Sequence, residues 1–277
     1  MDILKAVILG IVQGLTEFLP VSSSGHLVLL QKLMGIDEPA LFFDTMLHLG
    51  TLTAVFIVLR RDIWALLKRP FQRLTGLVIL ATLPTIAIAL AIKDFVEQAF
   101  HTGDYIGYGF LVTSALLLAA EALAARPGAR RQEKDMTWVD AVLIGTLQGA
   151  AIMPAVSRSG STIAGALSRR LDRDFAARFS FLMSIPAILG AAVLQAKDFI
   201  GDQDALASTI GASGSGTAGM GLLGVIAGTV AAAAVGVFAV TLMLKIIRTG
   251  TLRVFSLYTA VLGILILADQ FFFHLVF

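Results

Sequence analysis

Two polar segments with side chains suited to phosphate chemistry interrupt an otherwise apolar chain. They run over Gln13–His26 and Gln148–Ser161, and their first residues are 135 positions apart (148 − 13 = 135). The same offset matches Ser22 with Ser157. Both segments contain hydroxyls, glycines and a proline, but the acid and the histidine belong to the first and the arginine to the second. A doubled polar loop in a membrane chain indicates one composite site at a repeat interface.

Glu17 is the candidate metal ligand or acid/base group of the first segment. Gln13 precedes it by four residues and therefore shares its helix face, so we expect Gln13 to assist it. A carboxylate at membrane depth is expensive unless it is paired, hydrated or metal-bound. The alternative is that Glu17 is a structural hydrogen-bond partner for the turn.

A hydroxyl-rich turn follows, formed by Ser22, Ser23, Ser24 and Gly25, with a helix expected to open at His26. Successive backbone N–H groups at such a helix start can hold an anion. His26 is the candidate acid/base residue because its ordinary pKa lies near ~6.5. The alternative for the serines is ordinary helix capping.

Arg158 is the sharpest feature of the second segment. An arginine among hydroxyls suits bidentate recognition of a phosphate. We expect Ser157, Ser159, Gly160 and Thr162 to complete this binding site. The alternative, an ion pair between Arg158 and Glu17 that joins the two segments, is compatible with function because a resting pair can open to admit an anion.

Asp44 and His48 form a further i,i+4 pair early in an apolar segment, and their interpretation stays open between a functional role and simple hydration. Charge counting adds a cofactor. Glu17 and Arg158 roughly cancel, so a diphosphate would bring about two to three unneutralised negative charges. We therefore expect a divalent cation, Mg²⁺ or Ca²⁺, with Glu17 as its protein ligand.

The composition indicates an integral membrane protein. Of 277 residues, 57% are hydrophobic and 14% charged, against about a quarter charged in soluble domains. Cysteine is absent, which excludes disulfides and thiolate sites, and no basic stripe supports nucleic-acid binding. Six segments are long enough to span a bilayer. They are Leu41–Leu59, Leu74–Ile92, Tyr105–Ala124, Phe175–Leu194, Met220–Leu244 and Val254–His274.

Two shorter apolar segments, Ile3–Leu19 and Val139–Met153, end at the polar loops and are followed by short helical patterns at Leu27–Met34 and Ile163–Leu167. Each reads as a re-entrant helical hairpin, which is tolerated at membrane depth when it is buried in protein or lines a wet cavity. Each half then holds one hairpin and three spans, and an odd number of spans inverts the second copy.

The expected fold is therefore an all-α polytopic membrane protein with six transmembrane helices and two re-entrant hairpins in an inverted repeat. It forms a single domain over residues 1–277, with repeat halves of about 1–125 and 137–277. Basic residues cluster in the loops of one side, which the positive-inside rule makes cytoplasmic. Both termini are then outside, and the first hairpin enters from the outer face.

Taken together, the two polar segments resemble those of bacterial undecaprenyl-diphosphate phosphatases. Gln13–His26 is similar to that family's (E/Q)xxxE segment with its following Ser/Gly/His run, and Pro154–Thr162 is similar to its PGxSRSxxT segment. The resemblance extends over essentially the whole chain. One departure is Ala155, where the family pattern usually has glycine, and we expect it to restrict the turn to non-glycine backbone conformations.

The resemblance implies hydrolysis of undecaprenyl diphosphate to undecaprenyl phosphate and inorganic phosphate in the bacterial inner membrane. This reaction recycles the lipid carrier for cell-wall synthesis and is associated with bacitracin resistance. It also implies divalent-metal dependence. In the expected mechanism, Arg158 and its hydroxyls hold the phosphates, Ser23 attacks or positions water, and His26 is the acid/base partner.

Two rival functions stay open on the sequence. The first is a lipid transporter that flips undecaprenyl phosphate with the same headgroup site, because inverted repeats with re-entrant turns are a transporter design. The second is an ion or small-anion channel. The expected partners are the polyprenyl diphosphate substrate and membrane lipid, without nucleic acid, and a homodimer is an alternative to a monomer.

Overall fold

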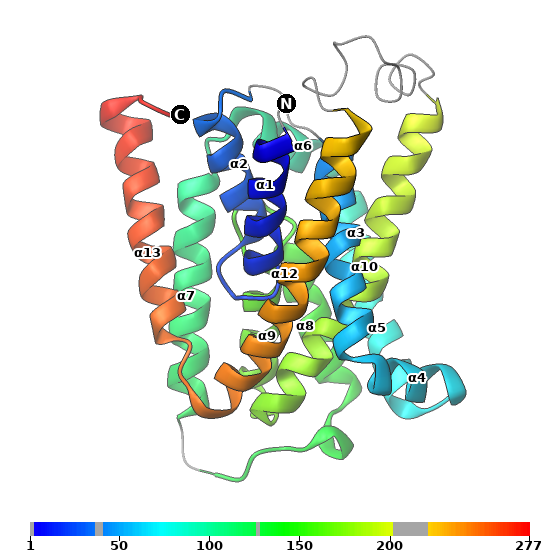
Figure 1. The fold of residues 1–277 in the computed structure, drawn as a ribbon. Helices are drawn as coiled ribbons and strands as arrows, with labels where there is room; N and C mark the ends of the chain where they lie inside the picture. The colour runs from blue at the N-terminus through cyan, green and yellow to red at the C-terminus, as the bar shows by residue number, and fades with distance from the viewer. Residues whose placement is uncertain (1–2, 37–40, 126–127, 202–220) are drawn as a thin grey trace.

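In the computed structural model, residues 3–36, 41–125, 128–201 and 221–277 are described, and these form a bundle of helices without a strand (Figure 1). The expected all-α class is confirmed for them. The long apolar helices are α3 (Leu41–Val58), α5 (Arg73–Ala91), α7 (Ile106–Ala124), α10 (Arg173–Gly201), α12 (Leu222–Thr249) and α13 (Arg253–Ala268).

Within the described residues, five helices are long and apolar enough to cross a membrane, and a sixth is obtained when α3 is joined to α4 (Arg60–Lys68), against which it is bent by 80°. Every expected span coincides with one of these helices to within several residues at its ends. Met220, where the sequence placed the start of the fifth span, lies outside the described residues.

The two expected hairpins are present at opposite ends of the bundle. The first is α1 (Ile3–Thr16) with α2 (Ser23–Leu33), and the second is α8 (Trp138–Ala150) with α9 (Arg158–Ser168). Figure 1 shows the connecting turns meeting near the middle, and α1 begins at the same end of the bundle at which α13 finishes.

The returning helices begin earlier than predicted, at Ser23 and Arg158 instead of Leu27 and Ile163. The reason is serine capping. The Ser22 hydroxyl accepts a hydrogen bond from the Gly25 N–H, and the Ser157 hydroxyl accepts one from the Gly160 N–H. Each helix therefore starts directly after its serine. About half of each polar segment therefore lies in helices, and the irregular turn lies between them.

Two short helices were not expected. Besides α4, the residues between the second and third spans form α6 (Lys93–Thr102), where the sequence predicted a plain connection. Short single-turn elements also occur at Glu133–Asp135 and Asp269–Phe273. Both α4 and α6 are polar on average and lie at the ends of long helices, so hydropathy alone does not reveal them.

The two hairpins pack crosswise, in the sense that each contacts a helix from the other half of the chain. Helix α1 lies chiefly on α12, and α8 lies chiefly on α5. A β-carbon added at Gly10 of α1 would come within 2.2 Å of the Gly228 carbonyl oxygen, and one at Gly145 of α8 within 2.0 Å of the Ala81 oxygen. Gly10 and Gly145 are themselves related by the 135-residue offset. Small residues of this kind allow helix backbones to approach closely.

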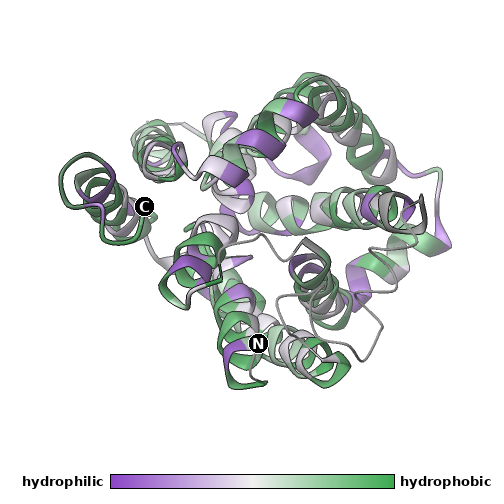
Figure 2. Ribbon diagram, turned by 90° about the horizontal axis from the view of Figure 1, so that it is seen from above, coloured by the Kyte–Doolittle hydropathy of each residue, from purple (hydrophilic) through white to green (hydrophobic). Residues whose placement is uncertain are grey.

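The outer surface of the bundle is apolar. Seen from the end, hydrophobic residues dominate the helices around the periphery (Figure 2). On α5 the side chains of Ile79 and Leu83 are more than half exposed, as are those of Leu257 and Ile264 on α13. Such an extended apolar exterior is expected of a surface that faces lipid.

An ion cluster holds the base of the second hairpin. The fully buried Asp140, at the start of α8, accepts hydrogen bonds from Arg131 (2.6 Å), Arg169 (2.6 Å) and the Thr137 N–H (2.7 Å). Burial alone would raise the pKa of Asp140, but the hydrogen bonds from the two arginines hold it well below the usual range of a carboxyl. At the base of the first hairpin, Lys5 donates to the Met34 carbonyl.

Candidate active site

The two hairpins are joined at an ion pair between Glu17 and Arg158. Glu17 directly follows α1 and is 5% exposed, and its Oε1 accepts a hydrogen bond of 2.5 Å from Arg158 Nη2. A second bond crosses between the turns, from the Ser159 hydroxyl to the Leu19 carbonyl at 3.1 Å. The pairing that the sequence offered as an alternative to a phosphate-binding role is therefore present.

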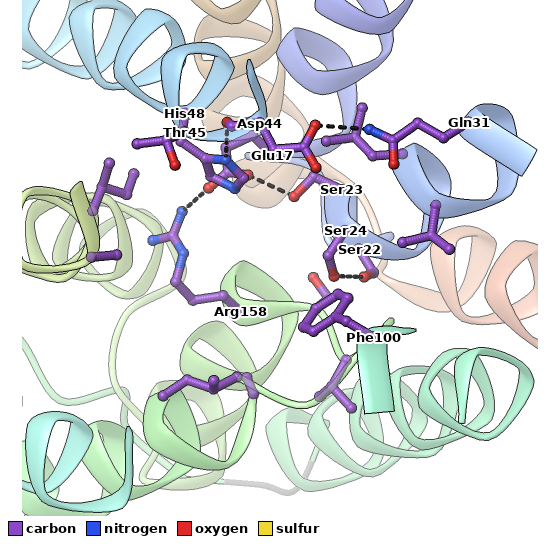
Figure 3. A pocket seen from close by; sticks show the side chains of 18 of the residues that line it. Glu17, Ser22, Ser23, Ser24, Gln31, Asp44, Thr45, His48, Phe100 and Arg158 are labelled. Atoms are coloured by element: carbon purple, nitrogen blue, oxygen red, sulfur yellow. Dashed lines mark hydrogen bonds and ion pairs between the residues drawn. The ribbon is translucent and has the colours of Figure 1, made fainter. Parts of the chain in front are cut away.

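The other oxygen of Glu17 collects three further polar atoms. Its Oε2 accepts hydrogen bonds from Gln13 Nε2 at 2.9 Å and from the Ser23 hydroxyl at 2.6 Å. The Nε2 atom of His48 lies 3.5 Å from the same oxygen. Figure 3 shows Glu17 between Ser23 and His48, with Arg158 reaching across from the opposite hairpin. The predicted contact between Gln13 and Glu17 is confirmed.

The serine turn of the first hairpin presents its hydroxyls to a cavity. Ser22 caps α2 with a left-handed backbone (φ 69°), its hydroxyl lies 3.3 Å from that of Ser24, and both line the cavity with Ser23. The first backbone N–H groups of an α-helix lack intrahelical partners and favour an anion. The start of α2 can therefore receive negative charge from a ligand in this cavity.

Arg158 has spare binding capacity. Its Nη2 contacts Glu17, but its Nη1 is buried and has no hydrogen-bond partner among the described residues. A buried guanidinium nitrogen without an acceptor is costly, whereas an anion in the cavity would satisfy it. Ser157 lines the cavity beside Arg158, and its hydroxyl accepts the Gly160 N–H at 3.0 Å.

The cavity has a volume of about 350 Å³ and two kinds of wall. Around Glu17 and Arg158 the wall is polar, whereas Leu27, Ile36 and Ile188 contribute to an apolar wall. Lys32, near the end of α2, and His101, near the end of α6, also line it. A cavity of this composition suits a ligand with a charged head and an apolar remainder.

Several predicted site residues lie behind the turns and do not line the cavity. The Gly25 N–H is used by the Ser22 cap, and a β-carbon there would meet Phe110 at 2.6 Å. The Thr162 hydroxyl donates to the Arg158 carbonyl and lies 2.6 Å from Ser180. Likewise, the Ser159 hydroxyl donates to the Leu19 carbonyl of the other turn, and the Gly160 N–H donates to the Ser157 cap. These residues shape the turns that carry Arg158 and Ser23.

His26 also faces away from the cavity. Its Nδ1 lies 2.6 Å from the Ser22 carbonyl and its Nε2 lies 2.7 Å from the hydroxyl of Tyr258 on α13. The Phe110 ring meets it edge-on, with 5.3 Å between ring centroids. No hydrogen bond between His26 and Ser23 is found among the described residues, although they are only one turn apart on α2.

The structure adds residues on which the sequence was open or silent. Asp44 and His48 both line the cavity, and Gln31 of α2 donates to Asp44 Oδ1 at 2.9 Å. His48 is held from its other side, since its Nδ1 lies 2.7 Å from the Asp44 carbonyl. The i,i+4 pair of polar residues in an apolar helix was the available signal. Tyr258, an aromatic residue in an apolar helix, had none.

Ala155 corrects a further expectation. It adopts φ 59°, a left-handed conformation that glycine favours, so the prediction of a non-glycine backbone is wrong. Its methyl group is fully buried against Ile106 and Phe110, which offsets the backbone strain by packing. Glycine at this position would adopt the same backbone conformation without steric strain.

The oxygens near Glu17 fit a divalent cation held together with substrate. No three His, Cys, Asp or Glu side chains gather into a metal site within the described ranges. Gln13 Oε1, however, is a buried acceptor with no partner there, and Asp44 lines the same cavity as Glu17. Mg²⁺ is commonly bound through one or two carboxylates plus substrate phosphates, so a complete protein cage is not required.

Comparison with known proteins shows the family of the chain. The family described as bacitracin resistance protein BacA matches residues 6–265. A protein of Carboxydothermus hydrogenoformans named undecaprenyl-diphosphatase is 49% identical over 270 residues, covering 98% of each chain. Undecaprenyl-diphosphatase 4 of Bacillus thuringiensis is 47% identical with the same coverage. Undecaprenyl-diphosphatase of Methanosphaera stadtmanae is 38% identical, covering 96% of this chain and 97% of that protein.

Proposed function

The chain belongs to the bacitracin resistance protein BacA family, and from this premise we propose that it hydrolyses undecaprenyl diphosphate to undecaprenyl phosphate and inorganic phosphate. It is a multi-pass membrane protein built on apolar helices. The observation that carries the assignment is the cavity in which Glu17, Ser23 and Arg158 meet, since it combines a base, a hydroxyl and a phosphate-binding cation.

Arg158 is proposed to bind the diphosphate. Its unpaired Nη1 provides a first contact, and Nη2 becomes available when the ion pair with Glu17 opens. Ser157 and the start of α2 supply further neutral donors to the phosphate oxygens. Phosphoryl transfer depends chiefly on such positioning and charge stabilisation. The apolar wall of the cavity then leads the polyprenyl tail toward lipid.

Ser23 is proposed as the nucleophile or as the residue that positions water. Its hydroxyl already donates to Glu17 Oε2, so Glu17 can receive the proton as Ser23 Oγ bonds to the terminal phosphorus. The bond from that phosphorus to the bridging oxygen breaks, and undecaprenyl phosphate leaves with the electron pair. Water then releases inorganic phosphate from Ser23. In the alternative, water attacks directly, and the same two residues orient it.

A divalent cation, Mg²⁺ or Ca²⁺, is proposed to be held by Glu17 with help from Gln13. When bound, it would neutralise phosphate charge and polarise the phosphoryl group. The unpartnered Gln13 Oε1 supports this assignment. His26 was predicted as the acid/base residue and stays so as a prediction, although its two ring nitrogens are engaged with Ser22 and Tyr258.

We also propose six spans in an inverted repeat, with halves of about 1–125 and 137–277. The opposed hairpins and the matched contacts of Gly10 and Gly145 support this arrangement. With basic loops in the cytoplasm, the cavity opens to the outer face of the inner membrane and both termini are outside. The homodimer stays a prediction.

Transport of undecaprenyl phosphate is the less favoured reading, because a transporter has no need for the Ser23–Glu17 hydrogen bond. Phosphate release by the purified protein in detergent separates the two. We expect release from undecaprenyl diphosphate, and its loss on adding a chelator, restored by Mg²⁺ or Ca²⁺. Absence of release under every condition would contradict hydrolysis. Phosphate release that continues in the presence of the chelator would contradict the proposed cation but not the proposed hydrolysis.

A further inference from the structure

His26 is held so that both of its ring nitrogens are used. A backbone carbonyl can only accept a hydrogen bond, so the contact with Ser22 places a proton on Nδ1. In the neutral ring Nε2 is then an acceptor, and the Tyr258 hydroxyl donates to it at 2.7 Å. The two rings also stack, with centroids 5.7 Å apart and planes 8° from parallel. The Ser22 carbonyl thus fixes the tautomer of His26, and Tyr258 holds the ring in place.

The Ser22 carbonyl belongs to a strained part of the active-site turn. Ser22 is left-handed at φ 69°, a conformation that non-glycine residues rarely adopt and that persists only when neighbouring contacts impose it. The backbone N–H of His26 reaches this carbonyl at 3.4 Å, whereas the imidazole reaches it at 2.6 Å. The shorter contact comes from the imidazole, so the ring of His26 is the closer support of the turn.

The next residue after this strained position is Ser23, whose hydroxyl contacts Glu17 at 2.6 Å. A rotation of the Ser22 backbone would therefore displace the Ser23 hydroxyl from the carboxylate. Tyr258 belongs to α13, whose docking on α7 has a separate hydrogen bond between Ser114 and Ser256. Loss of the Tyr258 hydroxyl alone should leave that docking in place.

We propose that Tyr258 is a positioning residue of the active site, which acts through His26 and the Ser22 carbonyl to hold Ser23 against Glu17. The inference rests on the proposed hydrolysis and adds to it a residue of α13 that lies outside both polar segments. The chain of contacts is Tyr258 Oη to His26 Nε2, His26 Nδ1 to Ser22 O, and Ser23 Oγ to Glu17 Oε2.

The test is Tyr258→Phe, which keeps the stacked ring and removes the hydroxyl alone. Because one hydrogen bond is lost, we expect kcat for phosphate release to fall about fivefold, with KM changed less than about twofold. Tyr108→Phe is the matched control, since Tyr108 is 47% exposed and Tyr258 is 46% exposed. A wild-type kcat for Tyr258→Phe, or an equal fall for Tyr108→Phe, would overturn the proposal.

Two further measurements separate positioning from a merely structural role. If Tyr258 acts through His26, then Tyr258→Phe should cause no further loss in a His26→Gln background, whereas an undiminished fivefold loss there would contradict the proposal. Independently of activity, ¹⁵N NMR of labelled histidine rings should place the His26 proton on Nδ1 and show the Nε2 resonance moving in Tyr258→Phe. An unmoved resonance would exclude the contact. If the wild-type protein releases no phosphate but the Nε2 resonance still moves in Tyr258→Phe, the proposed hydrolysis is refuted and the contact between Tyr258 and His26 stands.

Discussion

The two hairpins share a backbone design but divide the chemistry. In both hairpins the returning helix is capped by a serine. Three serines and Glu17 of the first hairpin line the cavity, whereas from the capped start of the second helix only Ser157 and Arg158 line it. Gln13 and its counterpart Gln148 both lie outside the cavity lining, but Gln13 donates to Glu17 whereas Gln148 donates to Thr85. A duplicated scaffold thus supplies two anchored turns, and the side chains decide which turn binds and which one reacts.

The hairpins also differ in how their strain and their bases are supported. The left-handed residue is the cap itself in the first hairpin, Ser22, but lies two residues before the cap in the second, Ala155. Hydrogen bonds offset the backbone strain at Ser22, and apolar packing offsets the backbone strain at Ala155. The base of the second hairpin has the buried Asp140, whereas among the described residues the base of the first has the hydrogen bond from Lys5 to the Met34 carbonyl.

Arg158→Ala should have the largest effect because it breaks the link between the hairpins and removes the proposed phosphate ligand. Loss of one partner of a buried pair costs about 3–5 kcal/mol, and the same loss from the transition state would lower kcat/KM by roughly 10²–10⁴-fold. Arg158→Lys should recover only part of this, since a lysine cannot make the forked contact. Phosphate release near the wild-type rate in Arg158→Ala would contradict the division of roles.

Asp140→Asn should affect the stability of the second hairpin more than the chemistry. Loss of the charge shared with Arg131 and Arg169 is expected to lower the free energy of unfolding by about 2 kcal/mol at pH 7. The pKa of Asp140 is depressed in the fold, so its contribution is fully present above the unfolded pKa of about 3.9 and is lost as pH falls toward the folded value.

Thermal unfolding in detergent checks this sign. The gap between wild-type and Asp140→Asn protein should be full near neutrality and should narrow below about pH 4. Asp104→Asn is a suitable control, because the carboxylate of Asp104 has no hydrogen bond or ion pair in the described structure. A gap that is constant down to pH 3 would show that Asp140 supports the hairpin without its charge.

Ala155→Gly should have the smallest effect, since two contributions oppose each other. Glycine would relieve a left-handed strain of about 1–2 kcal/mol. It would also remove a buried methyl, worth about 0.8 kcal/mol, and loosen the unfolded chain. The free energy of unfolding should therefore change by less than about 1 kcal/mol. A loss above 2 kcal/mol in denaturant unfolding would show that packing, and not backbone conformation, dominates at this turn.

Local patterns account for most of what the sequence predicted. Apolar runs located the long helices. The two polar segments, 135 positions apart, located both hairpins and led to the expected pairing of Glu17 with Arg158. The short helices α4 and α6 were missed because a search for long apolar runs passes over helices that are polar on average, although their apolar residues recur at a helical period. Contacts between segments far apart in the chain leave no local pattern, so nothing in the sequence pointed to the contact between His26 and Tyr258, which are 232 residues apart.

The direction of a side chain was the other limit. His26 lies one turn from Ser23, and spacing alone favours a contact between them, but the left-handed Ser22 turns the start of α2 so that the imidazole faces α13. Conversely, His48 reaches Glu17 from a separate helix, which spacing within the first segment could not reveal.

The crosswise packing of the hairpins sets an order for biogenesis. Gly10 meets its partner Gly228 only after 218 further residues have been synthesised (228 − 10 = 218). At about 5–20 residues per second, α1 waits roughly 10 to 45 s for α12. By contrast, Gly145 finds Ala81 already made. The first polar hairpin must therefore be sheltered during synthesis by water, lipid headgroups or the insertion machinery, whereas the second can dock as it emerges.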